Sequence, residues 1–267
     1  MISHPNQDRV AESVGPWVSH VPGLAHTGSA PLFRGDPRFE WLKLNAGALG
    51  LPWGNDRAVV DFGCLEGGWP HQFAWSGFRA LGVETNPRAF ARALVAREFL
   101  GFPGYRLACE YDAVRQWIAE EAAFSSLGRP CVSLAGFLYH QPDPENWIRQ
   151  ASEIIGDSNA WVYAWTHCFE GDPAALRDAR ITAQGIDHAP EGNHLGNVDS
   201  PRCCWFSRAQ LVSMMRDAGL SIVAFSVDFN HPHAATHGPA VSLLGVRKCN
   251  STTSWPDAGE RLIQQTP

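Results

Sequence analysis

The segment from Val59 to Trp69 reads V-V-D-F-G-C-L-E-G-G-W, and it constrains the fold more than any other part of the chain. A short apolar run leads directly into a glycine-rich turn, and a helical pattern follows. Gly63 and Gly67 can adopt positive φ angles and leave no Cβ between the backbone and a ligand. This strand, turn and helix predict a nucleotide-type binding loop in a doubly wound α/β fold.

Short apolar runs alternate with amphipathic windows from Ala58 onwards, which is typical of βαβ units and a mainly parallel sheet. Asn86-Pro87 and Asp143-Pro144 each place an N-cap residue before a proline at the first helical position. A capping box formed by Ser207 and Gln210 begins a later helix, and Gly219 ends it. Seven strands are predicted, at 58–62, 80–84, 105–109, 131–135, 160–165, 221–227 and 240–246.

The last two predicted strands are joined without a helical window, which favours an antiparallel pair at one edge. The predicted fold is therefore a doubly wound seven-stranded α/β sheet, with five parallel strands, an antiparallel edge pair and helices on both faces. Residues 1–56 are rich in Pro, Gly, His and Trp, have one helical window at 37–49, and are interpreted as an N-terminal cap. Residues 57–250 form the main domain with a lid insertion at 166–206, and 251–267 are a C-terminal tail.

The chain of 267 residues carries a formal net charge of −6 and contains no run of lysine and arginine. Nucleic acid is not an expected partner, because phosphate contacts need clustered basic side chains. The first thirty residues lack an apolar leader core, and no stretch is apolar over the length of a membrane span. We expect a soluble, cytoplasmic protein, either a monomer or a homodimer, with its seven cysteines reduced.

Glu84 ends the second predicted strand about twenty residues after the turn, where a carboxylate accepts hydrogen bonds from ribose hydroxyls. Both NAD and S-adenosylmethionine carry such a ribose, but the glycine pattern separates them. Leu65 occupies the second glycine position of the G-x-G-x-x-G fingerprint, which seats a pyrophosphate on a helix N-terminus. Asp61 and Glu66 would repel a pyrophosphate and would suit the ammonium and sulfonium groups of S-adenosylmethionine.

Three ordered motifs carry a family resemblance: D-F-G-C-L-E-G-G-W from Asp61, G-V-E at 82–84, and A-G-F-L-Y-H-Q-P-D-P at 135–144. Together they resemble the class I, Rossmann-like S-adenosylmethionine-dependent methyltransferases, from about Trp17 to Lys248. The L-Y-H motif is similar to the fourth motif of the small-molecule and wobble-uridine branches. Leu65 stands where a third glycine is commoner in this family, and Trp69 stands where smaller or tyrosine side chains are familiar.

The resemblance implies a role for individual residues of these motifs. Glu84 would bind both ribose hydroxyls, and Asp112 would accept a hydrogen bond from the adenine amino group, with Glu110 as an alternative. The residues implied around the methionine part of the cofactor are Asp61, Gly63, Cys64, Leu65 and Gly67. Those implied beside the adenine and the sulfonium are Thr85, Ala113, Ala135 and Gly136.

Methyl transfer by in-line displacement needs alignment of the reactants, and a base where the nucleophile carries a proton at neutral pH. His140 and His167 follow the fourth and fifth predicted strands at the carboxyl edge of the sheet, so either is a candidate base, with a structural role as the alternative. The region around Trp17 resembles the segment that caps the cofactor in related enzymes. The candidate aromatic contacts to the acceptor are Trp17, Tyr139, Trp165 and Trp205, with core packing as the alternative, favoured for Trp205.

The sequence thus predicts methyl transfer to an oxygen or nitrogen of a small-molecule metabolite, such as a natural-product precursor. Aromatic walls suit a planar or cationic acceptor. The alternatives are a wobble-uridine-type tRNA methyltransferase, a nicotinamide-dependent oxidoreductase, and a binding protein that keeps the fold without turnover. No metal is expected, because the spaced histidines His231, His233 and His237 have no accompanying carboxylate cluster.

Overall fold

The computed structural model describes residues 5–54, 57–101, 104–124, 128–156, 158–189, 202–231, 238–247 and 257–266. The chain divides into two compact units, Met1–Pro130 and Cys131–Pro267. The strand order of the main sheet is β3-β2-β1-β4-β5-β10-β9, with the first three strands in the first unit and the other four in the second. The order and the strand directions confirm the predicted seven-stranded doubly wound sheet with an antiparallel edge pair.

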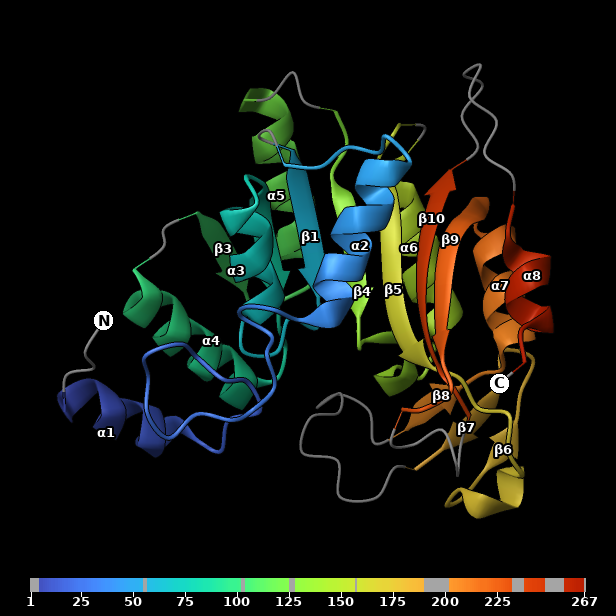
Figure 1. Ribbon diagram of the computed structural model, residues 1–267, viewed down its shortest axis with the longest axis horizontal. Helices are drawn as coiled ribbons and strands as arrows, with labels where there is room; N and C mark the ends of the chain where they lie inside the picture. The colour runs from blue at the N-terminus through green and yellow to red at the C-terminus, as the bar shows by residue number, and fades with distance from the viewer. Residues whose placement is uncertain are drawn as a thin grey trace. The chain divides into compact units, whose positions relative to one another are not determined.

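In the first unit, three parallel strands are accompanied by helices (Figure 1). Val60 lies opposite Leu81, which in turn lies opposite Arg106. The aliphatic residues of β1 and β2 are almost fully buried, as expected for strands covered on both faces. The elements are α1 (Pro5–Val14), α2 (Pro37–Ala48), β1 (Ala58–Phe62), α3 (Gly68–Trp75), β2 (Arg79–Val83), α4 (Pro87–Leu100), β3 (Tyr105–Ala108) and α5 (Ala113–Phe124).

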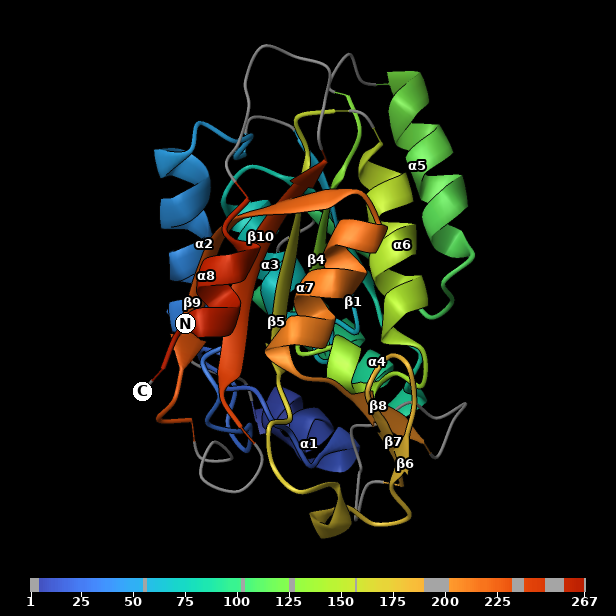
Figure 2. The same ribbon diagram turned by 90° about the vertical axis from the view of Figure 1, so that its right-hand side faces the viewer.

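In the second unit, β4 and β5 are parallel, and β10 runs antiparallel to both β5 and β9. Helix α7 packs between α6 and α8, and both α7 and α8 contact β9 (Figure 2). The elements are β4 (Cys131–Ala135), η1 (Leu138–His140), α6 (Pro144–Ile155), β5 (Trp161–His167), η2 (Pro173–Ala175), β6 (Arg180–Ile181), β7 (Ile186–His188), β8 (Cys203–Trp205), α7 (Arg208–Asp217), β9 (Leu220–Asp228), β10 (Ala240–Arg247) and α8 (Gly259–Gln264).

The predicted helix ends are confirmed by their capping contacts. The side chains of Asn86 and Asp143 accept amide hydrogens from the first turns of α4 and α6, and proline follows each cap. Ser207 and Gln210 form the reciprocal capping box of α7. Gly219 follows that helix with a φ of 76°, as a C′ glycine does.

Three parts of the chain differ from the sequence prediction. Strand β5 runs on to His167 because His167 pairs with Ala240 of β10, so the insertion begins later than residue 166. The insertion contains a small sheet of order β6-β7-β8, while residues 190–201 lie outside the described residues. The segment predicted as a tail contains α8, which packs on α7 and β9 with Leu262 fully buried.

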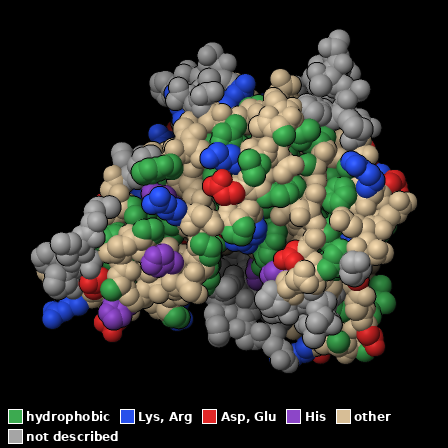
Figure 3. All heavy atoms as spheres, viewed as in Figure 1, with side chains coloured by type: hydrophobic (Ala, Val, Ile, Leu, Met, Phe, Trp, Pro, Cys, Tyr) green, Lys and Arg blue, Asp and Glu red, His purple; other side chains and the backbone are tan. Residues whose placement is uncertain are grey.

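The surface carries charges of both signs. On the face in Figure 3, lysine and arginine side chains are scattered among acidic ones, with no continuous basic patch among the residues coloured there. Within the described residues, no helix is long and apolar enough to cross a membrane. Six cysteines are described and all six are free thiols.

Candidate functional site

The turn after β1 uses left-handed backbone conformations at three positions. Gly63, Leu65 and Gly67 have φ values of 67°, 52° and 82°. The amides of Gly63 and Cys64 donate to the carbonyl oxygen of Val83 at 2.8 and 3.0 Å, which joins the turn to β2. Glycine adopts these conformations readily, whereas Leu65 needs external contacts to hold it there.

Glu84 supplies such a contact from the end of β2. Its Oε2 accepts the amide hydrogen of Leu65 at 2.8 Å, and its Oε1 accepts that of Asn86 at 2.7 Å. Burial raises the pKa of the Glu84 carboxyl, while the two amide hydrogen bonds and the charge of Arg92 act in the opposite direction. Each carboxylate oxygen can accept more than one hydrogen bond, so ribose hydroxyls can be additional donors to Glu84.

Cys64 and Gly82 pack together beneath the turn. Burial raises the pKa of the Cys64 thiol well above its usual range, and the charges of Glu84 and Asp61 add to that effect. A Cβ on Gly82 would lie 2.8 Å from Cys64 Sγ and 2.6 Å from Pro70 Cγ. The glycine of the G-V-E motif is therefore needed for close packing, a requirement that only the tertiary structure reveals.

Glu66 has a different environment from the one that the sequence suggested. Its carboxylate is fully buried, and it accepts the amide hydrogens of Val18 at 2.9 Å and Ser19 at 2.7 Å. Arg92 Nε lies 2.8 Å from Glu66 Oε1. The guanidinium and the two amides compensate the charge of Glu66, so the prediction that Glu66 offers free negative charge to a ligand is wrong.

Residues 32–36 cover the first turn of α3. A Cβ on Gly68 would lie 2.7 Å from the backbone of Leu32, and Gln72 Nε2 donates to the Leu32 carbonyl oxygen at 2.7 Å. Trp69 Nε1 donates to Asp36 Oδ2 at 2.9 Å. Trp69, the departure from the family pattern, is therefore a buried residue that fixes this covering segment.

Trp17 packs inside the N-terminal segment, and its contact to an acceptor stays a prediction. Its indole nitrogen donates to the carbonyl oxygen of Ala11 at 2.7 Å, and the residue is only 8% exposed. It contributes to a buried apolar cluster, so its ring area is used for packing. The other buried members of that cluster are Ala11, Val21, Leu24, Phe33 and Ala96.

The residues predicted for the adenine follow β2 and β3. Thr85 is partly exposed directly after Glu84, and Ala113 is the first residue of α5. Both Glu110 and Asp112 are exposed before α5, so the assignment of the adenine amino group to Asp112 stays a prediction.

The charges around the turn fit one class of ligand. Asp61, Glu66 and Glu84 are buried carboxylates, and the buried guanidinium of Arg92 pairs with Glu66. Acidic side chains beside the turn oppose a pyrophosphate and suit the ammonium and sulfonium groups of S-adenosylmethionine. The residues present therefore fit S-adenosylmethionine.

The second unit carries a cluster of aromatic rings around His167, the last residue of β5. The ring centroid of His167 lies 4.5 Å from that of Tyr139 and 4.9 Å from that of Trp165. The indole of Trp205 lies 5.8 Å away and within 17° of parallel. The structure thus brings three of the aromatic residues predicted for the acceptor, Tyr139, Trp165 and Trp205, together with the candidate base His167. It places His167 at the end of the strand instead of beyond it.

Gly136 lies against the same rings. Its φ is 74°, and its amide donates to the carbonyl oxygen of Trp165 at 2.8 Å. A Cβ at this position would lie 3.7 Å from the Trp165 ring and 3.8 Å from Tyr139 Oη. Gly136 and the preceding Ala135, at the end of β4, therefore bring main chain close to the aromatic cluster.

Further histidines belong to this cluster. His140, in η1, packs on Tyr139 with ring centroids 4.2 Å apart, and burial lowers the pKa of His140 to about 4, so it is neutral near pH 7. Sequence reasoning missed the positions of His231, 4.6 Å from His167, and of His188, 5.5 Å from Trp205. These rings are far apart in the sequence, so no local sequence pattern predicts that they are in contact.

The spaced histidines after β9 are described only in part. His233 and His237 lie outside the described residues. Among the residues that are described, no group of three or more His, Cys, Asp or Glu side chains is placed to hold a metal ion.

Comparison with known proteins places this geometry in a family. Residues 40–224 match the family model described as a methyltransferase domain. The N-terminal domain of EvdMO1 with S-adenosylhomocysteine bound gives a TM-score of 0.63 at 21% identity, covering 94% of this chain and 98% of that chain. None of the curated proteins matches the sequence.

Two other solved structures share the fold. A SAM-dependent methyltransferase from Methanosarcina mazei gives a TM-score of 0.53 at 14% identity, covering 73% of this chain and 94% of that chain. The 1,6-didemethyltoxoflavin-N1-methyltransferase of Burkholderia thailandensis gives 0.51 at 16% identity, covering 83% and 80%.

The family match spans well over half of the chain and includes the turn after β1, Glu84, and the rings of Tyr139, Trp165, His167 and Trp205. The fold and the charge of the turn agree with that match. The chain therefore belongs to the methyltransferase domain family and is an S-adenosylmethionine-dependent methyltransferase with a Rossmann-like fold.

Proposed function

We propose that the chain transfers the methyl group of S-adenosylmethionine to an oxygen or nitrogen atom of a small-molecule acceptor. The observation that carries this proposal is the cluster of rings around His167. Tyr139, Trp165 and Trp205 are each partly exposed, so their rings can contact a planar or cationic ligand. A cluster of this kind suits a metabolite better than a phosphate backbone, which needs grouped basic side chains.

In this proposal the first unit binds the cofactor. Glu84 accepts hydrogen bonds from the ribose hydroxyls while it keeps the amides of Leu65 and Asn86. The turn from Asp61 to Gly67 surrounds the methionine part. Asp112, or Glu110 in its place, accepts from the adenine amino group, and Thr85 and Ala113 flank the ring. When bound, S-adenosylmethionine supplies an electrophilic methyl group.

The proposed base is His167. Its imidazole lies centrally among Tyr139, Trp165 and Trp205, where it can take the proton of a bound hydroxyl or amine. His140 is neutral at neutral pH because burial lowers its pKa. The same low pKa makes its imidazole a weak proton acceptor, so it is a poor general base. We therefore assign His140 to holding Tyr139, with which its ring is in contact.

One structural neighbour binds a small molecule. The Burkholderia thailandensis enzyme was crystallised with 1,6-didemethyltoxoflavin, a small molecule. At 16% identity, the similarity between the two structures shows only a shared fold.

Labelled cofactor distinguishes the acceptor classes. The purified protein is incubated with methyl-labelled S-adenosylmethionine and either a small-molecule extract or total tRNA from the organism that encodes it. We expect label in a small molecule, and a large loss of that label in His167→Asn. The control Glu153→Gln, in an exposed ion pair on α6, should label like the wild type. Label in tRNA alone would contradict the proposal.

A further inference from the structure

The buried carboxylate of Glu66 has no role in the proposed chemistry, yet it joins three segments of the first unit. Glu66 lies in the turn, between Leu65 and Gly67. Its two oxygens accept the amide hydrogens of Val18 and Ser19, at 2.9 and 2.7 Å. These partners lie 48 and 47 residues earlier in the chain, so the contact fixes the N-terminal segment to the turn.

Arg92 brings α4 into the same connection. Its Nε lies 2.8 Å from Glu66 Oε1, and its Nη1 donates to the carbonyl oxygen of Val14 at 3.5 Å. Both side chains of the pair are almost completely buried, at 5% exposed for Arg92 and 0% for Glu66. A buried ion pair that also satisfies backbone groups is sensitive to the loss of either partner.

The turn needs such support because of Leu65. Its φ of 52° is one that L side chains rarely adopt, and it persists only where the surroundings hold it. Glu84 accepts the amide hydrogen of Leu65 itself, and Glu66, the next residue, is anchored through its carboxylate to the amides of Val18 and Ser19. The two carboxylates therefore fix the conformation of the turn from both sides of the Leu65 peptide unit.

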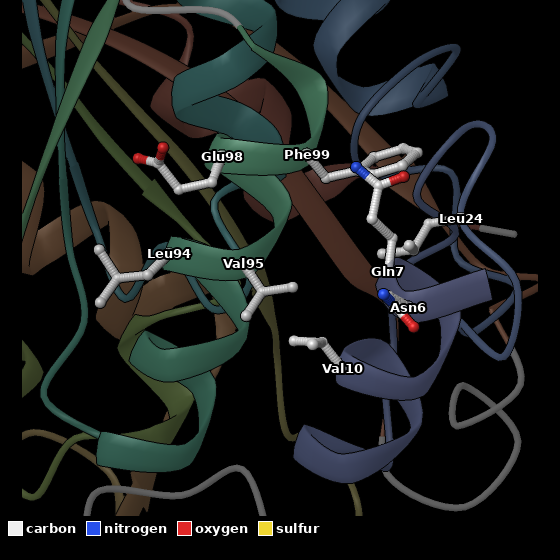
Figure 4. A pocket seen from close by; sticks show the side chains of 8 residues that line it. All are labelled: Asn6, Gln7, Val10, Leu24, Leu94, Val95, Glu98 and Phe99. Atoms are coloured by element: carbon white, nitrogen blue, oxygen red, sulfur yellow. The ribbon is translucent and has the colours of Figure 1, made fainter. Parts of the chain in front are cut away.

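Packing between α1 and α4 leaves part of their interface open. A groove of about 430 Å³ lies between the two helices. Figure 4 shows Val10 and Val95 beside it, on facing sides of α1 and α4. Val10 remains 47% exposed at this groove. The buried cluster around Trp17 packs the N-terminal segment on α4, and the contacts of Glu66 and Arg92 fix the backbone of residues 14–19 to the turn and to α4.

We propose that the Glu66–Arg92 ion pair is a positioning latch for the cofactor turn, an inference that rests on the proposed cofactor site. By holding the backbone of residues 14–19 against the turn, the pair keeps the turn in its binding conformation before the cofactor enters. Both are positioning residues, because their buried side chains pair with each other and with backbone groups of the N-terminal segment. Loss of the pair weakens cofactor binding because binding must then order the turn and the N-terminal segment.

The experiment compares Glu66→Gln with the wild type, using S-adenosylhomocysteine as the probe. Calorimetry should show binding that is at least tenfold weaker in the variant, which is about 1.4 kcal/mol. Hydrogen exchange without ligand should show faster exchange of the Val18 and Ser19 amides, and added ligand should slow it. If Glu66→Gln does not fold, the double variant Glu66→Gln/Arg92→Met replaces it, because it removes both buried charges.

A matched control exists in the second unit. Glu170 and Arg208 form an ion pair between side chains that are 32% and 10% exposed, so Glu170→Gln also removes a partly buried pair. We expect this control to lower the melting temperature and to leave the affinity for S-adenosylhomocysteine within about twofold of the wild type.

The outcomes separate the latch from the cofactor site on which it rests. If the wild type fails to bind S-adenosylhomocysteine, the cofactor site is overturned and the latch with it. If the wild type binds and Glu66→Gln binds equally well, the latch alone is overturned. Unchanged exchange at Val18 and Ser19 in the variant would also overturn the latch, because the pair would not then hold the segment.

Discussion

Glu84 Oε2 lies 2.8 Å from the amide nitrogen of Leu65, and this hydrogen bond joins the end of β2 to the turn after β1. The same carboxylate is the group that we assign to the ribose. One side chain thus shapes the turn and offers acceptor atoms at its edge. We therefore expect a substitution at Glu84 to disturb the conformation of the turn and to weaken cofactor binding at the same time.

Replacement of Glu84 by alanine should weaken S-adenosylhomocysteine binding by about 100-fold or more. The change removes the acceptor for the ribose hydroxyls and frees the amide of Leu65, and hydrogen bonds to a charged group contribute about 1.5–3 kcal/mol each. Calorimetry measures the effect. Glu98→Gln, in an exposed ion pair on α4, is the control and should bind normally. Equal affinities for Glu84→Ala and the wild type would remove Glu84 from the site.

The affinity for the cofactor should also decrease in mild acid. Burial raises the pKa of Glu84 above its ordinary value of 4.5, so the carboxylate begins to take up a proton at a higher pH than an exposed glutamate. A protonated Glu84 accepts hydrogen bonds poorly, so binding weakens as the pH falls through this raised pKa. Calorimetry over a pH series should give a midpoint above 4.5 in the wild type, and Glu84→Gln should lack that transition.

The sequence predicted the features that have local causes. The strands are apolar runs, and the ends of α4, α6 and α7 follow from caps such as Asn86 that act within one helical turn. The short strands β6 to β8 carry too few residues to form a pattern. The sequence predicted that Glu66 offers negative charge to a ligand, because its actual partners, Val18 and Ser19, are distant in sequence. The rings of His167 and His231 are likewise distant in sequence, and only the tertiary structure brings them into contact.

The cysteines should react at very different rates with a thiol reagent. Cys109 is exposed, whereas the other five described cysteines are buried. Burial raises the pKa of Cys203 and of Cys204 to about 11, so neither forms much thiolate near pH 8. In a Cys249→Ser background, which removes the cysteine outside the described residues, Ellman's reagent should find one fast thiol. Cys109→Ser should abolish it, and a second fast thiol would contradict the burial of the others.

His140 should make the fold sensitive to acid. Burial lowers its pKa from 6.5 to about 4, so the folded protein resists protonation of this imidazole while the unfolded chain accepts it. The stabilisation is present above pH 6.5 and is lost as the pH falls through about 4, with a total of up to about 3 kcal/mol at 1.36 kcal/mol per pKa unit.

Urea unfolding at a series of pH values tests the contribution of His140 through the difference between the wild type and His140→Gln. Glu84, with a raised pKa, gives a contribution of opposite sign, which is present at low pH and lost as the pH rises through that pKa, so the wild-type curve alone mixes the two. The difference between the two proteins should shrink as the pH falls from about 6.5 to 4, because protonation then costs the wild type its advantage. His20→Gln, at an exposed position, should parallel the wild type. A difference that stays constant across this pH range would show that His140 does not titrate as a buried imidazole.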